Sequence, residues 1–435
     1  MFGRDFLARY KRGHVVAYKV ARSTFWQIGE KVLRMVATLV VGVWVARYLG
    51  PARFGLLNYA IAFVALFTFL ADVGLQAVVV RDLVRRPEDR PGIVASAMTV
   101  RLLGASLAIG TTSGAIWALR PHDAAARLMV LVIALGLIPQ AWDIIDYDYQ
   151  SRLNPRPVVL ARTCSLIAFS LGRIALIVTN AQLVWFAWAV AGEAALSALL
   201  LRWRFRGALP RFGLAHATWR EMRRLLSESW PVAISGLSAT LYMRIDQIML
   251  GQMLGDRAVG VYSAAVRVSE SWYFLPMAMV AAAAPALTAA HRVSEATYRR
   301  KLLSVMRVLV WISILAACIL HFASRRIVGL LYGAAYHQAA EVLAIHAWAG
   351  VFVSMGLASG SWFVNVGLLR LRMINTLIGA AANILLNFIV IPRYGVIGAA
   401  FATLVSYCLA GFVLNAAAAP SRPAFVLQLR SLVFR

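Results

Sequence analysis

Arginines placed inside apolar stretches are the residues of this chain best suited to bind a charged molecule. Arg34, Arg101, Arg173, Arg244 and Arg267 each lie in a run of apolar residues long enough to cross a bilayer. A charge at the centre of a membrane helix costs roughly 2.5–3.5 kcal/mol on the insertion scale. Guanidinium groups bind phosphate oxygens through two parallel hydrogen bonds. We therefore predict that these arginines line a wet cavity and bind an anionic substrate.

Carboxylates lie in the same kind of stretch. They are Asp72, Asp143, Asp146, Asp246 and Glu270. Intramembrane acids mark ion pathways and proton relays, so all five are candidates for coupling transport to an ion. Asp72, at mid-depth in its stretch, and Asp246, in D-x-x-M-L-G, are the leading candidates.

Some of these charges can neutralise each other on one helix. Glu30 and Arg34 are four residues apart, and Arg267 and Glu270 are three apart. Each pair can therefore form an ion pair on one helix face, and a purely structural role stays open for both pairs. Three arginines have no carboxylate at these spacings, and for them we expect cavity lining in preference to salt bridges between helices: Arg101, Arg173 and Arg244.

Two other polar groups also allow more than one interpretation. Asp143 and Asp146 belong to a group with Asp148, which we expect to be solvated, and the group can pair with Arg152 or with loop arginines. Three asparagines fall near one helix face and suit either sugar binding or hydrogen bonds between helices: Asn375, Asn383 and Asn387.

Motifs for chemical catalysis are missing from the sequence. It contains no Walker-type loop, HExxH, GxSxG or CxxC. The three cysteines lie in different apolar stretches without metal-type spacing. We expect no catalytic residue, no metal site and no cofactor, and therefore a protein that is not an enzyme.

Continuous apolar stretches fill the chain and predict an all-α integral membrane protein, because roughly 20 apolar residues in a helix cross a bilayer. The hydrophobic content of 61% is far above the soluble norm. The twelve predicted spans are 24–46, 56–80, 93–118, 127–149, 158–179, 183–202, 229–252, 259–286, 301–322, 338–364, 373–391 and 396–415.

The formal net charge is +26, and the basic residues are unevenly distributed between the two predicted sides of the membrane. When the sides alternate with each span, the side of the N-terminus holds several times more Lys and Arg than the other. The positive-inside rule then places both termini and the central linker in the cytoplasm. This distribution explains the basic composition, so we expect no nucleic-acid partner.

A short internal repeat indicates two related halves. LGPARFGLLNYA (49–60) follows the first span and LGDRAVGVYSAA (254–265) follows the seventh. We predict two six-helix bundles related by a pseudo-two-fold axis along the membrane normal, with a central cavity between them. The predicted segments are 1–23 (cytoplasmic N-terminal segment), 24–202 (first bundle), 203–228 (linker), 229–415 (second bundle) and 416–435 (cytoplasmic tail).

Three stretches carry a family likeness. RIDQIMLGQMLGDRAVGVYSAAVRV (244–268), NILLNFIVIPRYGVIGAAFATLVSY (383–407) and RYLGPARFGLLNYA (47–60) resemble, in order and spacing, Wzx-type polysaccharide flippases. That family belongs to the superfamily that includes MATE multidrug exporters and the lipid II flippase. The lipid II flippase usually has 14 spans, two more than predicted here.

The resemblance implies outward movement of an undecaprenyl-diphosphate-linked oligosaccharide, for O-antigen (lipopolysaccharide) or exopolysaccharide, across the bacterial inner membrane. It also implies a polymerase and a chain-length regulator as partners. Two alternatives stay open. A MATE-like exporter of organic cations would favour an acidic cavity, whereas here arginines equal or outnumber acids within the spans. A polysaccharide polymerase or ligase usually carries a large periplasmic loop, and the largest one predicted here, 323–337, is small.

Overall fold

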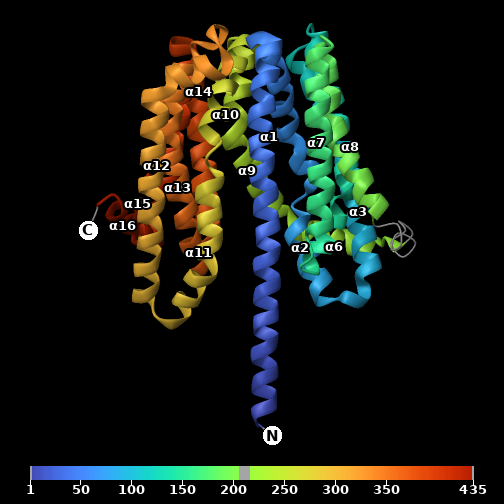
Figure 1. Ribbon diagram of the computed structural model, residues 1–435, viewed down its shortest axis with the longest axis vertical. Helices are drawn as coiled ribbons and strands as arrows, with labels where there is room; N and C mark the ends of the chain where they lie inside the picture. Colours follow the sequence, from blue (N-terminus) through green and yellow to red (C-terminus); the bar gives the residue numbers. More distant parts are fainter. Residues whose placement is uncertain (1, 205–215, 434–435) are drawn as a thin grey trace. The chain divides into compact units, whose positions relative to one another are not determined.

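Helices make up the described chain. The computed structural model describes residues 2–204 and 216–433, with side chains from residue 26 onward, and shows long helices joined by short turns (Figure 1). This agrees with the predicted all-α class. The side chains of the predicted N-terminal segment 1–23, and linker residues 205–215, lie outside the described set.

The helices before the linker are α1 (Phe2–Asp72), α2 (Leu75–Arg85), α3 (Arg90–Leu119), α4 (Ala124–Leu135), α5 (Leu137–Gln140), α6 (Ile144–Ser151), α7 (Arg156–Val178) and α8 (Leu183–Arg204). Those after it are α9 (Trp219–Met253), α10 (Asp256–Glu270), α11 (Phe274–Val293), α12 (Glu295–Tyr332), α13 (Ala339–Asn365), α14 (Leu369–Cys408), α15 (Leu414–Ala417) and α16 (Arg422–Ser431). Short 3₁₀ turns lie at Pro87–Asp89, Ala141–Asp143, Ala334–Tyr336 and Ala419–Ser421, and a π turn lies at Leu409–Val413.

Most predicted spans correspond to long apolar helices. In the described part of the chain, nine helical stretches are long and apolar enough to cross a bilayer. Two of them, Trp26–Arg85 (60 residues) and Leu369–Ala417 (49 residues), are each long enough for two passes. α9 is not among the nine, and it carries Arg244 and Asp246 in its apolar part. The nine stretches and α9 together correspond to the predicted spans.

Glycines mark a bend in each copy of the internal repeat. Gly50 (φ 70°) interrupts α1 and Gly255 (φ 85°) precedes α10, both in the left-handed region that favours glycine. Each repeat also has a second glycine that packs against the other repeat. A Cβ on Gly55 would lie 1.7 Å from the Asp256 carbonyl oxygen, and one on Gly260 would lie 1.9 Å from that of Pro51. The two copies therefore pack backbone to backbone.

The chain forms two compact units. The N-terminal unit contains residues 1–38 and 67–234, and the C-terminal unit contains residues 39–66 and 235–435. These units are a different division from the predicted halves, because the middle of α1 groups with the C-terminal helices and the first turns of α9 with the N-terminal ones. The boundaries of the two symmetric bundles stay a prediction.

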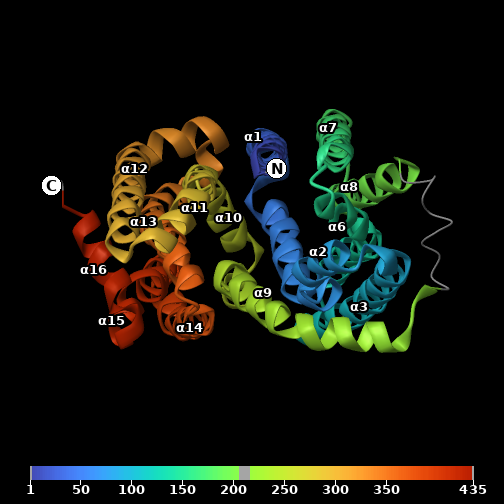
Figure 2. The ribbon, with the colours of Figure 1, turned by 90° about the horizontal axis from the view of Figure 1, so that it is seen from below.

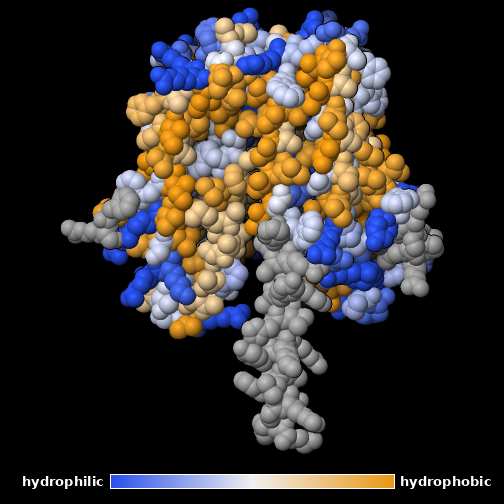
Figure 3. Space-filling view, in the orientation of Figure 1, coloured by the Kyte–Doolittle hydropathy of each residue, from blue (hydrophilic) through white to orange (hydrophobic). Residues whose placement is uncertain are grey.

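Each unit has its own apolar core. In the N-terminal unit, Leu75, Ile93 and Leu225 pack together from α2, α3 and α9. In the C-terminal unit, Met306 of α12 and Trp362 of α13 pack with residues of α11 and α16. On the face shown in Figure 3, apolar side chains cover the middle of each unit and hydrophilic ones gather toward its ends. That distribution is expected of helices surrounded by lipid.

The start of α9 is attached to the N-terminal unit through charged side chains. Arg224 contacts Asp82 at 2.5 Å, and Arg86 contacts Glu221 at 2.9 Å. Arg81 also pairs with Glu228. Residues 219–228 were expected to be linker, but they form helical turns that lie across α2 and α3 (Figure 2). We call these contacts the α2–α9 clamp.

Candidate functional site

The predicted polar residues fall into two groups, one in each unit. The first group, which we call the N-terminal charge network, contains Glu30, Arg34, Asp72, Arg101, Asp143, Asp146, Tyr147, Arg162, Arg173 and Glu193. The second group, the Asp246 cluster, contains Asp246, Tyr262, Asn383, Asn387 and Thr403, with Arg244, Arg267 and Glu270 nearby.

Glu193 joins two of the predicted arginines. Its Oε1 accepts a hydrogen bond from Arg34 Nη1 at 2.8 Å, and its Oε2 accepts one from Arg173 Nη2 at 2.9 Å. Arg34 also pairs with Glu30 at 2.8 Å, as its spacing predicted. A single carboxylate on α8 thus fixes guanidinium groups from α1 and α7. Because each carboxylate oxygen binds a different arginine, the two guanidinium groups face one anion.

Arg101 forms the second part of the network. It lies 3.1 Å from Asp72 and 3.8 Å from Asp143, and its side chain is only 5% exposed. The Tyr147 hydroxyl donates to Asp72 at 3.1 Å and accepts from Arg101. The close approach of α1 and α3 makes this possible, because a Cβ on Gly104 would lie 2.2 Å from the carbonyl oxygen of Leu70.

A break in the fourth predicted span positions the third part. The helix is interrupted between α4 and α6, where the 3₁₀ turn Ala141–Asp143 lies. Gly136, at this break, packs closely against α8, since a Cβ on Gly136 would lie 3.1 Å from the Cα of Ala191. Asp143 and Asp146 then contact Arg162 at 3.2 and 3.0 Å. The break therefore brings two carboxylates toward the arginines of α7.

A cavity of about 470 Å³ lies against this network inside the N-terminal unit. Its wall includes three acidic and three basic side chains: Glu30, Lys31, Arg34, Asp143, Arg162 and Glu193. Small residues of α8, Ala194 and Ser197, leave room between them. The cavity is charged but balanced, so an anion can bind there only by replacing a carboxylate partner or by arriving with a cation.

For Arg101 and Arg173, the preference for cavity lining over salt bridges between helices is wrong. Both pair with carboxylates of other helices, Asp72 and Glu193, because burying an unpaired guanidinium is costlier than burying a pair. Asp148, expected to be solvated, is fully buried and lies 3.0 Å from Arg90, and also 3.0 Å from Arg152, the partner that was expected.

Apart from Glu30, three members of the network were not predicted as site residues from the sequence: Glu193, Arg162 and Tyr147. Arg162 lies within the fifth predicted span and has no carboxylate three or four residues away, so the criterion that selected Arg173 would have found it. Tyr147 gave no comparable signal, since a tyrosine near a span end is expected as an interfacial residue.

The Asp246 cluster is built differently. Asp246 is 2% exposed, and its Oδ2 accepts hydrogen bonds from Tyr262 at 2.8 Å and Thr403 at 2.6 Å. Its Oδ1 accepts from Asn387. Among the described residues, no Arg, Lys or His side chain forms an ion pair with this carboxylate. The carboxylate of Asp246 is therefore stabilised only by neutral hydrogen-bond donors of the described residues.

Oxygen atoms are concentrated around Asp246. Asn387 donates to Asn383 Oδ1 at 3.0 Å, and the Oδ1 of Asn387 itself is buried with no hydrogen-bond partner in the described structure. Carboxylate, amide and hydroxyl oxygens are the ligands that hard cations prefer. With these residues on α9, α14 and α10, the cluster suits a proton or a small hard cation.

Arg244, Arg267 and Glu270 lie near the Asp246 cluster, whereas Asn375 lies further along α14. Arg267 donates to Asn58 at 3.2 Å, and its guanidinium lies 5.2 Å from the ring centre of Phe54. Arg244 and Arg267 both interact electrostatically with Glu270. The Asn375 amide donates to Asn415 at 3.2 Å. All three asparagines are buried in side-chain contacts, which agrees with their interpretation as hydrogen-bonding residues of the helix bundle.

Comparisons with known proteins give the family and the fold. A family model described as "Polysaccharide biosynthesis protein" matches residues 20–291, and the model "MatE" matches residues 231–389. The probable low-salt glycan biosynthesis flippase Agl15 of Haloferax volcanii is 24% identical over 200 residues. That match spans 45% of this chain and 42% of the relative, so it covers less than half of the relative's length.

Solved structures of low sequence identity share the fold along nearly the whole chain. An inward-facing multidrug resistance MATE family transporter of the MOP superfamily has a TM-score of 0.71 at 16% identity, covering 92% of this chain and 94% of its own. The lipid II flippase MurJ has a TM-score of 0.66 at 16% identity, covering 95% and 90%. The chain therefore has the MOP-superfamily fold of a multi-pass membrane protein. Family and fold agree with the resemblance seen in the sequence.

Proposed function

The chain belongs to the polysaccharide biosynthesis protein family, and from this premise we propose that it is a flippase for lipid-linked oligosaccharide. The cargo is an oligosaccharide attached to undecaprenyl diphosphate. It moves from the cytoplasmic to the periplasmic leaflet of the bacterial inner membrane, with both termini of the protein in the cytoplasm. The likeness to the Haloferax protein, a probable glycan biosynthesis flippase, supports this substrate class.

One observation carries the proposal: Glu193 holds Arg34 and Arg173 on its two oxygens, beside the charged cavity. A diphosphate has two linked anionic groups and carries roughly two negative charges, so it can engage both guanidinium groups through charge-assisted hydrogen bonds. In this account the carboxylate of Glu193 occupies the anion position when no substrate is bound. Substrate binding is then an exchange of one anion for another.

The exchange removes the main difficulty of an arginine cavity inside a membrane. Unpaired guanidinium groups would raise the cost of the empty state by several kcal/mol each. With Glu193 in place the empty site is neutralised, and the diphosphate, which carries more charge and more acceptor oxygens, displaces it. Arg162, which lines the cavity and pairs with Asp143, offers a further guanidinium group to the substrate.

Transport then follows alternating access. Residues 24–202 move relative to residues 229–415, while the polyprenyl chain stays on the lipid-facing side of the protein. The Asp246 cluster binds a proton or a small cation, whose release or uptake favours one of the two conformations. Arg244, Arg267 and Glu270 lie near this cluster and adjust its charge. A polymerase and a chain-length regulator act on the delivered product.

The membrane potential favours this direction. One charge moved across 100 mV gains about 2.3 kcal/mol, so a dianionic head group leaving a negative interior gains roughly twice that if it crosses the full field. Outward flipping therefore needs no obligatory antiported cation. An uncharged analogue of the substrate should flip in liposomes with a clearly weaker voltage dependence, and an unchanged dependence would contradict this account.

A second function, export of an organic cation, is favoured by one observation: half of the charged residues at the cavity wall are acidic. The two functions differ in the sign of the cargo. A cation exporter needs the carboxylates and should tolerate loss of Arg173, whereas the flippase should not.

The test is flipping by the purified full chain in proteoliposomes, with a fluorescent undecaprenyl-diphosphate-linked sugar as substrate and a chemical quencher outside. We expect the wild type to expose the probe, Arg173→Gln to lose most of the rate, and Arg326→Gln, an exposed arginine at the far end of α12, to behave like wild type. Flipping of an organic cation instead, with no movement of the lipid-linked sugar, would refute the proposal.

A second test uses cells. A strain lacking the gene should accumulate lipid-linked repeat units on the cytoplasmic side and lose the corresponding surface glycan. Restoration by the wild-type gene and not by the Arg173→Gln gene would connect this phenotype to the network. Unchanged surface glycan in the deletion strain would contradict it.

A further inference from the structure

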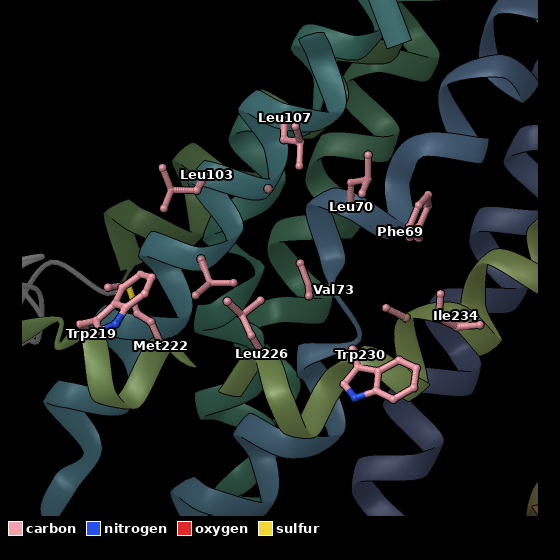
Figure 4. A pocket seen from close by; sticks show the side chains of 13 residues that line it. Phe69, Leu70, Val73, Leu103, Leu107, Trp219, Met222, Leu226, Trp230 and Ile234 are labelled. Atoms are coloured by element: carbon pink, nitrogen blue, oxygen red, sulfur yellow. The ribbon is translucent and has the colours of Figure 1, made fainter. Parts of the chain in front are cut away.

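An apolar groove of about 380 Å³ lies in the N-terminal unit, apart from the charged cavity (Figure 4). Its walls come from the end of α1, the middle of α3 and the first turns of α9. All of its lining residues are apolar or aromatic. It is open along one side, since Leu103 is 63% exposed and Trp230 is 60% exposed. Such a surface binds hydrocarbon and not a polar solute.

The groove exists because the start of α9 has two faces. Trp219, Met222, Leu226 and Trp230 recur at three- or four-residue spacing and line the groove. Residues 221, 224 and 228 lie on the opposite face and form the α2–α9 clamp. A helix with a charged face held by protein and an exposed aromatic face is suited to the membrane interface. The groove therefore opens where lipid chains are available.

The groove shares two walls with the N-terminal charge network. At the end of α1, Leu70 and Val73, the first residue after the helix, line the groove, while Asp72 pairs with Arg101. On α3, Leu103 lines the groove, while Arg101 reaches Asp72 and Asp143. Asp143 in turn lines the charged cavity. The same short segments thus present hydrocarbon on one side and paired charges on the other.

We propose that this groove binds the polyprenyl chain of the substrate while its diphosphate binds the N-terminal charge network. The inference rests on the proposed function and deepens it, because it assigns the lipid part of the cargo to named residues. The occupant must combine an anionic head with a single hydrocarbon chain that can lie along a narrow apolar surface. A polyprenyl diphosphate has this form, whereas a membrane phospholipid carries two acyl chains on one head group.

The experiment uses the purified full chain in nanodiscs and a photoactivatable undecaprenyl phosphate, with a photoactivatable phosphatidylglycerol in parallel. We expect the isoprenoid probe to label residues 69–73, 100–107 and 219–234, and excess undecaprenyl phosphate to remove this labelling. Leu103→Trp fills the groove and should lower labelling about tenfold, a moderate loss of binding free energy. Leu171→Trp, at an equally exposed leucine of α7 outside the groove, should have no effect.

Three labelling results would overturn the proposal: labelling outside these segments, labelling unchanged by Leu103→Trp, or equal labelling by phosphatidylglycerol that undecaprenyl phosphate does not displace. The proposed function fails separately. If the groove is labelled as expected but the wild type flips no lipid-linked sugar, the groove binds an isoprenoid and the flippase proposal is wrong. If Leu103→Trp abolishes labelling but flips at the normal rate, the flippase proposal stands and the groove does not hold the transported chain.

Discussion

The N-terminal charge network and the Asp246 cluster solve the same physical problem in opposite ways. Both keep carboxylates inside membrane helices. The network balances each carboxylate with a guanidinium group, as Glu193 does with Arg34 and Arg173. Asp246 has only neutral donors, Tyr262, Thr403 and Asn387. A balanced network is suited to exchanging one charged partner for another, whereas an uncompensated carboxylate is suited to gaining a positive charge.

The largest effect should come from removing both arginines that face Glu193. Because each charge-assisted hydrogen bond contributes about 1.5–3 kcal/mol, we expect Arg34→Gln with Arg173→Gln to slow sugar-lipid flipping roughly a hundredfold or more. If both bind one diphosphate, their effects should be coupled and not simply additive. Flipping rates of the two single variants and the double variant measure this. Independent, additive losses would place the arginines at separate sites.

Cation dependence should separate the two regions. Asp246→Asn removes the only charge of the cluster, so we expect transport by this variant to lose its response to a sodium or proton gradient. Asp72→Asn, in the network, should keep that response. Flipping measured with and without each gradient checks both. A response that survives Asp246→Asn but disappears in Asp72→Asn would reverse the assignment of the coupling site.

The stability of the folded protein should also distinguish the N-terminal charge network from the Asp246 cluster. Asp72→Asn leaves the buried Arg101 without its nearest carboxylate, and we expect a loss of about 1–3 kcal/mol of unfolding free energy. Asp246→Asn removes a buried charge, and the partnerless Oδ1 of Asn387 can accept from the new amide, so we expect no loss. Thermal unfolding in detergent compares the two variants. A larger loss for Asp246→Asn would show that the cluster is a structural hydrogen-bond centre.

The smallest effect concerns pH and the α2–α9 clamp. Burial raises the pKa of Glu221, but hydrogen bonds from Arg224 and Arg86 outweigh this effect and hold the pKa below its usual value. A lowered pKa stabilises the folded clamp above the ordinary glutamate pKa of about 4.3, and this stabilisation is lost as the pH falls through the lower folded value. Protection of residues 219–228 against hydrogen exchange should therefore fall in acid. Glu221→Gln should remove only part of that pH dependence, because the other two carboxylates of the clamp, Asp82 and Glu228, remain.

Much of the fold could be predicted from the sequence, because the length of the apolar spans and the distribution of Lys and Arg between the connecting loops can be read from the chain alone. The repeated LG motif could be recognised in the sequence, and its glycines, Gly50 and Gly255, both have positive φ angles. The division into compact units could not be predicted in the same way. Nothing in the pattern of residues 39–66 indicates that they pack with the C-terminal helices, because packing of long helices depends on distant partners.

Several members of the N-terminal charge network could be selected from the sequence, but their pairs could not. The cost of burying charge selected Arg101 and Arg173 as unusual, yet local spacing cannot reveal a partner such as Glu193 on another helix. Arg162 was missed for another reason, because the criterion that selected Arg173 applies to it as well. Contacts between helices, which place Asp143 and Asp146 beside Arg162, depend on the break near Gly136 and not on sequence spacing.

We propose that, without substrate, the Glu193 carboxylate occupies the position that a diphosphate takes. Calorimetric titration of inorganic pyrophosphate into the purified wild type, Glu193→Gln and Glu30→Gln tests it most directly. Removing the competing carboxylate should tighten pyrophosphate binding by about tenfold in Glu193→Gln, with a smaller change in Glu30→Gln, whose partner Arg34 keeps its contact with Glu193. Binding that is weaker or unchanged in Glu193→Gln would contradict the account.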